Sequence, residues 1–204
     1  MARVLVIVPF PLDEGGIGRR SAQLEKVELG PDIEFDFRGV RAGPALFDSG
    51  HDLGMAEVAL AEAGIRAQEE GYDAVCIDTM SDSGGAILRS FLDIPVIGPG
   101  RASYLTALML GDTFSVLTQW DGWIGIYKKG VRELGVESRC ASIRSISTLR
   151  SARVDFDDCD TGALSFRGTG VIGGSISPQA GRSGSGVHRF KEVGVALRFA
   201  QLAE

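Results

Sequence analysis

The chain has 204 residues, a formal net charge of −6 at pH 7 and three cysteines, and these numbers exclude several classes of protein. An acidic balance without a basic block argues against nucleic acid as a partner. Few, unpaired cysteines predict no disulfide framework and favour a reducing compartment. No apolar run has the length of a membrane span, and the run at residues 4–8 lacks the features of a signal peptide. We therefore expect a cytoplasmic protein that does not interact with membranes.

The chain opens with a strand pattern. Residues 3–8 are apolar and β-branched, and the prolines that follow end the predicted strand. Residues 11–18 are rich in glycine, which predicts a flexible connection, with an anion cradle as the alternative. Residues 33–38 alternate between apolar and charged side chains, and this period of two predicts a half-exposed strand near a sheet edge.

A helix and a buried strand are predicted next. Residues 54–70 have helical periodicity, with Met55 and Val58 in a mostly apolar stripe and Gly71 as the terminator. Residues 74–77 form a short apolar run without a gap, which is typical of a strand buried on both faces of a parallel sheet. Polar and glycine residues follow at once.

The pattern of strand and helix then repeats. Residues 86–92 predict a helix and residues 95–97 a strand, and the pattern continues with a helix at 102–110, a strand at 113–118, a helix capped by Asp121 and a strand at 139–146. This alternation predicts an α/β fold with mostly parallel strands and right-handed crossovers. Beyond residue 150 the period weakens, although residues 187–202 are consistent with a last helix.

One candidate site follows the buried strand. It combines carboxylates and hydroxyls at the carboxyl end of a strand, where open α/β sheets place ligands, and its members are Asp78, Thr79, Ser81, Asp82 and Ser83. The alternative is structural: Asp82 or Ser83 caps the next helix and Asp78 holds the turn. From composition the two interpretations weigh about equally.

A second candidate is Thr118, followed by Gln119, Trp120 and Asp121. It lies at the same end of the sheet as Thr79 if both strands are parallel, and its hydroxyl could bind a substrate carboxylate. The alternative is an ordinary strand end before a helix cap.

Other motifs give weaker evidence of function. Residues 168–173 match G-x-G-x-x-G, but Val171 and Ile172 resemble the strand itself, so dinucleotide binding is not expected. Cys76 and Cys140 are predicted core residues, and like charge beside Cys159 disfavours its thiolate. His51 and His188 have no nucleophile nearby in sequence, and no cluster has the spacing of a metal site.

The segments at residues 71–84, 92–100 and 114–118 together resemble the Asp/Glu/hydantoin racemase superfamily. The resemblance covers roughly residues 1–146. It implies two similar open parallel-sheet α/β halves related by a pseudo-two-fold, with a small-molecule site in the cleft between them. The chain would then be one racemase-like unit over residues 1–204, with halves at 1–100 plus the C-terminal helix and at 101–190.

The resemblance also implies a chemistry. Family racemases use two opposed cysteines, without a cofactor, to remove and return a Cα proton. Thr79 stands at the first of these positions and Ser175, after Gly174, at the second. A hydroxyl is a far weaker acid than a thiol and needs an adjacent base, which Asp78 or Asp82 could supply. Substrate-binding roles fall to Asp78, Ser81, Asp82, Ser83 and Thr118.

Three functions are therefore weighed. The first is a racemase-type isomerase of an amino-acid-like or hydantoin-like molecule. The second is altered chemistry on the same scaffold, as in a lyase or a cis–trans isomerase acting on a small dicarboxylate. The third is a non-catalytic binder of a small carboxylate. A small molecule is the expected partner in each, no metal or cofactor is expected, and a homo-oligomer is left open.

Overall fold

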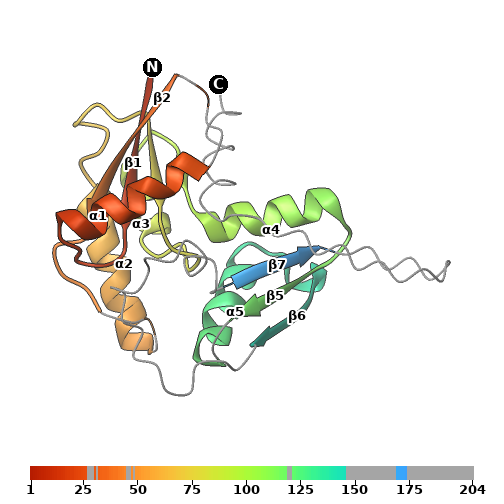
Figure 1. Ribbon diagram of the computed structural model, residues 1–204. Helices are drawn as coiled ribbons and strands as arrows, with labels where there is room; N and C mark the ends of the chain where they lie inside the picture. The colour runs from red at the N-terminus through yellow and green to blue at the C-terminus, as the bar shows by residue number, and fades with distance from the viewer. Residues whose placement is uncertain are drawn as a thin grey trace. The chain divides into compact units, whose positions relative to one another are not determined.

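The computed structural model describes residues 1–26, 30, 32–44, 47, 49–118, 121–145 and 169–173. The described residues form two units, the first ending at Ala102 and the second beginning at Ser103. Each unit is built on a sheet of its own (Figure 1). The mixed α/β architecture with parallel strands that the sequence predicted is confirmed.

The sheet of the first unit contains four parallel strands in the order β2-β1-β3-β4. Their bounds are β1 (Ala2–Val8), β2 (Ile33–Gly39), β3 (Ala74–Ile77) and β4 (Val96–Ile97). All four residues of β3 are buried, as its uninterrupted apolar run predicted, whereas β2 lies at the edge and is only partly buried. Strand β3 therefore lies inside the sheet, and its carboxyl end is held by neighbours on both sides.

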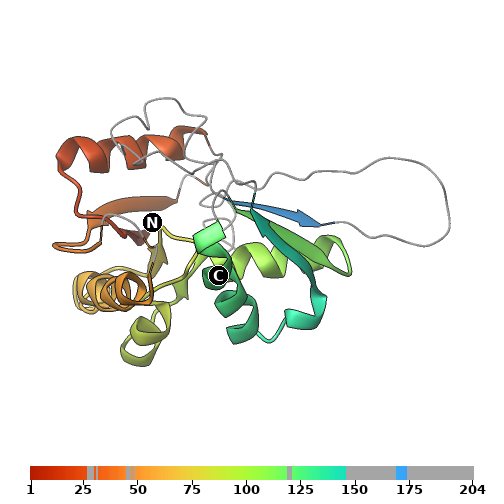
Figure 2. The same ribbon diagram turned by 90° about the horizontal axis from the view of Figure 1, so that it is seen from below.

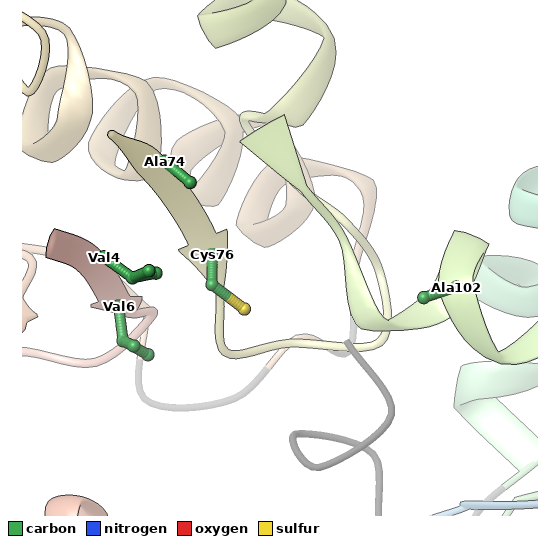
Figure 3. Close-up of a cluster of buried hydrophobic side chains, with 5 residues drawn as sticks. All are labelled: Val4, Val6, Ala74, Cys76 and Ala102. Carbon is green, nitrogen blue, oxygen red and sulfur yellow. The ribbon is translucent and has the colours of Figure 1, made fainter. Parts of the chain in front are cut away.

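Helices cover both faces of this sheet (Figure 2). Helix α1 (Glu14–Ser21) lies on one face, while α2 (Gly50–Gly64) and α3 (Gly85–Phe91) lie on the other. Gly64 allows α2 a close approach, since a Cβ there would lie 2.5 Å from Cδ1 of Ile7. A cluster of small buried side chains is formed by residues of β1 and β3 and by one residue that follows β4 (Figure 3): Val4, Val6, Ala74, Cys76 and Ala102.

The glycine-rich segment after β1 is not a flexible connection, so that prediction is wrong. Asp13 accepts a hydrogen bond from the Gly16 N–H at 2.7 Å and caps α1. Gly16 is buried, and a Cβ there would lie 2.9 Å from Cβ of Leu12. The N-cap and this close packing offset the low helix propensity of glycine.

The face that α2 buries also differs from the prediction. Ala56, Leu60, Ala61 and Gly64 are its buried residues, whereas Met55 and Val58 are 47% and 66% exposed. The helix begins four residues earlier than expected because Ser49 caps it, accepting from the Asp52 N–H. Small residues thus determine the packed face, since they allow a close approach to the sheet.

The second unit has three strands in the order β6-β5-β7, with bounds β5 (Phe114–Thr118), β6 (Cys140–Ser145) and β7 (Thr169–Gly173). Strands β5 and β6 are parallel, whereas β7 is antiparallel to β5. The ring of Tyr104 in α4 (Pro99–Leu110) stacks on Phe114, with centroids 5.4 Å apart. Helix α5 (Ile124–Glu133) buries Tyr127 and Val131.

The strand expected at Val171 and Ile172 is confirmed as part of β7. Asp121 does not cap α5, whose N-cap is Trp123; its carboxylate instead hydrogen-bonds the Ser145 hydroxyl. Three short 3₁₀ helices complete the described elements: η1 (Ala22–Lys26), η2 (Asp121–Trp123) and η3 (Glu137–Arg139). No described helix is long and apolar enough to cross a membrane.

Several sequence predictions concern residues outside the described part of the chain. They are Ser175, His188, Cys159, Gln119, Trp120 and the helix at 187–202.

Candidate functional site

The candidate site is the turn over residues 78–84, which joins β3 to α3 in the first unit. The N–H of Asp78 donates to the carbonyl of Ile7 at 2.9 Å, so the pairing of β3 with β1 continues into the start of the turn. The turn is thereby fixed at the carboxyl edge of a parallel sheet, the usual place for ligand-binding side chains in open α/β folds.

Three hydroxyl groups form a row along this turn. Thr79 Oγ1 and Ser81 Oγ lie 3.2 Å apart, and Ser81 Oγ and Ser83 Oγ lie 2.9 Å apart, each pair within hydrogen-bond distance. Ser83 is 1% exposed, while Thr79 and Ser81 are partly exposed. These three hydroxyls therefore lie together, and the row leads from a partly exposed hydroxyl to a buried one.

Asp82 holds the start of α4 rather than the start of α3. Its carboxylate accepts from the N–H groups of Gly100 at 2.8 Å and Arg101 at 2.6 Å. Its backbone is left-handed, with φ of 51°, which is uncommon for a residue other than glycine. Burial raises the pKa of Asp82 to about 6, although these two N–H groups and the charges of Arg89 and Arg101 lower it in part.

The expectation that Asp82 or Ser83 caps the next helix is therefore wrong. The N-cap of α3 is Gly84, with φ of 79° and no capping side chain. Its N–H donates to Oε2 of Glu57 in α2, at 2.6 Å. The acceptor comes from a residue 27 positions earlier, which local sequence patterns do not reveal.

Glycines make room for the Asp82 carboxylate. A Cβ on Gly98 would lie 2.3 Å from Cγ of Asp82, and one on Gly100 would lie 2.3 Å from the carbonyl oxygen of Met80. Contacts this short between a Cβ and another heavy atom are essentially never found in proteins. Both positions therefore require glycine if the turn is to reach α4.

Asp78 does more than hold the turn. Oδ2 of its side chain, which is 8% exposed, lies 3.3 Å from Nη1 of Arg20 in the last turn of α1. Burial raises the pKa of Asp78, and the Arg20 charge offsets part of that rise. Arg20 was missed by sequence reasoning because it lies 58 positions before Asp78, in a segment for which no element was predicted.

The two carboxylates of the turn also influence the pKa of the Cys76 thiol. Burial raises the pKa of this thiol, and the negative charges of Asp78 and Asp82 raise it further. The thiol therefore stays protonated, in agreement with the prediction that Cys76 is a core residue. Cys140 is partly buried at the start of β6, where its Sγ donates to the Ser142 carbonyl at 3.6 Å, and burial raises the pKa of this thiol as well.

Thr118 belongs to the second unit. It ends β5 in the second sheet, so it does not share a sheet edge with Thr79, which follows β3 in the first. Thr118 is 1% exposed, and its Oγ1 makes no hydrogen bond with the described residues. Buried hydroxyls usually have a hydrogen-bond partner, so Thr118 is an exception within the part of the chain that the structure describes.

The fold and this turn define an α/β protein with an acid- and hydroxyl-lined sheet edge. A model of the Asp/Glu/hydantoin racemase family matches residues 20–163, which is well over half of the chain. The chain belongs to this family.

Individual proteins that resemble this chain in sequence or structure are racemases of the same kind. A hydantoin racemase from Pseudomonas sp. (strain NS671) is 30% identical over 105 residues, which cover 52% of this chain and 42% of that protein. An allantoin racemase from Klebsiella pneumoniae has a TM-score of 0.64 at 25% identity, covering 71% of this chain and 58% of its own. An allantoin racemase from Pseudomonas fluorescens has a TM-score of 0.62 at 24% identity, covering 70% and 60%. This chain thus spans less than two thirds of the length of each relative.

Proposed function

We propose that this chain is a cofactor-independent isomerase of the racemase type, which transfers a Cα proton on an amino-acid-like or hydantoin-like molecule. The observation that carries the proposal is the hydroxyl row at the carboxyl edge of β3, which begins at Thr79. Membership of the racemase family supports the same chemistry. Thr79 takes the first catalytic position and Ser175 the second, both in place of the family's cysteines.

The acid–base roles follow from what the turn carboxylates contact. Asp82 is engaged by two backbone N–H groups, so it positions the turn and α4. Asp78 makes one ion pair at 3.3 Å and has acceptor capacity left for a substrate. Ser81 and Ser83 bind substrate or orient the Thr79 hydroxyl.

The test is proton NMR in D2O with enantiopure amino acids, 5-substituted hydantoins and allantoin. We expect the Cα–H signal of one class to disappear with native protein and to persist with boiled protein. Thr79→Ala should lower the exchange rate at least tenfold. Ser90→Ala removes an exposed hydroxyl on α3 that bonds the Ile87 carbonyl, so it serves as the matched control and should leave the rate unchanged. An unchanged rate in Thr79→Ala would refute the role of Thr79.

One observation favours a second candidate, a non-catalytic binder of a small carboxylate. Among the described residues, the Thr79 hydroxyl contacts Ser81 and no carboxylate, so nothing there acts directly as its base. The double variant Thr79→Cys/Ser175→Cys separates the two functions. A wild type without exchange that gains exchange in the double variant indicates a binder on a racemase scaffold.

A further inference from the structure

The row of three hydroxyls on the turn after β3 has a buried end and a partly exposed end. Ser83, at the buried end, is 1% exposed, and among the described residues its hydroxyl has one hydrogen-bond partner, Ser81 Oγ at 2.9 Å. Thr79, at the other end, is partly exposed and also meets Ser81 Oγ, at 3.2 Å. The direction in which Ser81 donates therefore determines what the Thr79 hydroxyl can do.

The burial of Ser83 sets this direction. A hydroxyl has one proton to donate, and a buried donor without an acceptor is costly. Among the described residues, Ser81 Oγ is the acceptor that Ser83 contacts, so Ser83 donates to it. Ser81 Oγ also accepts from the N–H of Ser83 at 3.4 Å, which occupies its second lone pair. The proton of Ser81 is then left to donate to Thr79 Oγ1.

The buried end of the row is held in place from two sides. The N–H of Gly84, the residue after Ser83, donates to Oε2 of Glu57 in α2 at 2.6 Å. The carboxylate of Asp82, the residue before Ser83, accepts from the N–H of Gly100 in α4 at 2.8 Å. Because both neighbours are anchored, the Ser83 hydroxyl is oriented before any reaction begins, which is the condition for a preorganised donor.

We propose that Ser83 and Ser81 form a one-directional hydrogen-bond relay that ends on Thr79 Oγ1, with Ser83 as a positioning residue for proton transfer. Because Thr79 Oγ1 accepts from Ser81, its own proton is free to point away from the row. When Thr79 delivers that proton to a substrate carbanion, its O–H bond breaks, a C–H bond forms at Cα and the negative charge passes to Oγ1. The Ser81 hydroxyl then stabilises that charge, since hydrogen bonds to ionised acceptors are the stronger ones.

The relay serves the proton transfer assigned to Thr79, so this inference rests on the proposed function. Ser81 and Ser83 then orient and support the Thr79 hydroxyl rather than bind substrate. A hydroxyl needs such support more than a thiol does, because it is the weaker acid. Within the described part of the chain the Thr79 hydroxyl contacts no carboxylate, and the relay supplies the support instead.

The test replaces Thr79 by a residue whose ionisation can be measured without a substrate. In Thr79→Cys, the introduced thiolate takes the place of the charged Oγ1, and its pKa follows from the rate of alkylation by iodoacetamide over a series of pH values. Tandem mass spectrometry assigns the alkylation to position 79. Ser81→Ala, added to Thr79→Cys, should raise the pKa of the introduced thiol by about one unit, because the thiolate loses a hydrogen bond. Ser83→Ala should raise it by about half a unit.

A double substitution separates the relay from a merely structural effect. Ser83 acts on residue 79 through Ser81, so Ser81→Ala/Ser83→Ala in the Thr79→Cys background should have the same thiol pKa as Ser81→Ala alone, whereas independent effects would add. Ser83→Thr keeps the hydroxyl and should keep the thiol pKa of Thr79→Cys. Ser103→Ala is the matched control, because it removes a serine hydroxyl that is also buried but has no hydrogen-bond partner among the described residues.

A thiol pKa that Ser81→Ala leaves unchanged, or effects of the two serine substitutions that add, would overturn the relay. If Ser83→Ala does not fold, Ser81→Ala and Ser83→Thr carry the test, and the relay fails if Ser83→Thr shifts the thiol pKa as far as Ser81→Ala does.

The rate of Cα exchange is a separate readout. With Thr79 in place, Ser83→Ala should lower the exchange rate at saturating substrate by about threefold, the factor that half a pKa unit represents, and leave KM unchanged. A saturating rate equal to that of wild type would overturn the positioning role of Ser83. Thiol pKa values that shift as expected, without Cα exchange on any compound, would instead refute the proposed function and leave the relay standing.

Discussion

The carboxylate of Asp82 accepts a hydrogen bond from the N–H of Gly100 at 2.8 Å, across 18 residues of chain. This contact joins the turn that carries Thr79 to the first turn of α4. Asp82 lies at the positive end of the helix dipole of α4, where a negative charge is stabilised. The candidate site therefore depends on a residue for which the sequence offered two interpretations, a substrate-binding side chain or a local helix cap.

The glycine before α4 is a sensitive position in this arrangement. Gly98→Ala would place a Cβ 2.3 Å from Cγ of Asp82, so the carboxylate must leave its position or the backbone must move. We expect a loss of about 3 kcal/mol in the free energy of unfolding, measured by urea denaturation. Gly50→Ala is the control, because nothing lies within 4 Å of its added Cβ. Equal stabilities of the two variants would contradict the close packing.

Two glycines of α2 should respond with opposite signs to the same substitution. Gly64→Ala would bring a Cβ to 2.5 Å from Ile7 and 3.2 Å from Leu88, so it should destabilise the chain by about 1 to 3 kcal/mol. Gly54→Ala enters open space in the same helix and should stabilise the chain by roughly 0.5 to 1 kcal/mol. Thermal unfolding of the two variants checks this. A shift in the same direction for both would show that α2 does not approach the sheet as described.

The acceptor of the Gly84 N–H can be tested on α2 as well. Glu57→Ala leaves that buried N–H without its 2.6 Å bond, so unfolding should be easier by about 1 to 3 kcal/mol. Glu57→Gln keeps an acceptor oxygen and should cost less. Glu62→Ala, an exposed glutamate on the same helix, should stay within about 0.5 kcal/mol of wild type. Denaturant midpoints that rank these variants otherwise would argue against this contact.

Asp82 gives a dependence of stability on pH. Burial raises its pKa from 3.8 to about 6, so between these pH values the folded chain binds a proton that the unfolded chain does not. The free energy of unfolding should therefore fall as pH rises from about 4 to about 6, by up to about 3 kcal/mol. Burial also raises the pKa of Asp78, which acts in the same direction.

The measurement is the difference in the free energy of unfolding between wild type and Asp82→Asn across this pH range. Asparagine does not titrate, so the difference isolates the contribution of Asp82. A difference that stays constant, or that grows in favour of wild type as pH rises, would contradict a raised pKa.

The sequence predicted much of the sheet. A strand that is buried on both faces is an uninterrupted apolar run in the sequence, and such a run can be recognised. Strands β3 and β1 were predicted for that reason. Helix α1 was missed because its glycines contradict helix propensity and only the Asp13 cap favours it. The buried face of α2 was assigned wrongly because hydrophobicity does not indicate how closely a helix approaches a sheet, which here depends on Ala and Gly.

The residue types at the candidate site could be predicted from the sequence, but the contacts that their carboxylates make could not. Hydroxyls two positions apart on one turn, such as Thr79 and Ser81, are brought together by local geometry. The partners of the carboxylates come from distant elements: Arg20 from α1 and Gly100 from α4. Contacts between residues far apart in the chain follow from tertiary packing, which one sequence does not encode in any local pattern.

Cofactor-independent proton transfer at Cα is the central claim. Its most direct test is deuterium incorporation by wild-type protein that has been dialysed exhaustively against EDTA and returned to chelator-free buffer in D2O. We predict that at least one chiral hydantoin, allantoin or amino acid loses its Cα–H signal, at a rate proportional to protein concentration and equal before and after dialysis. No exchange with any of these compounds, or exchange that the chelator abolishes, would contradict the account.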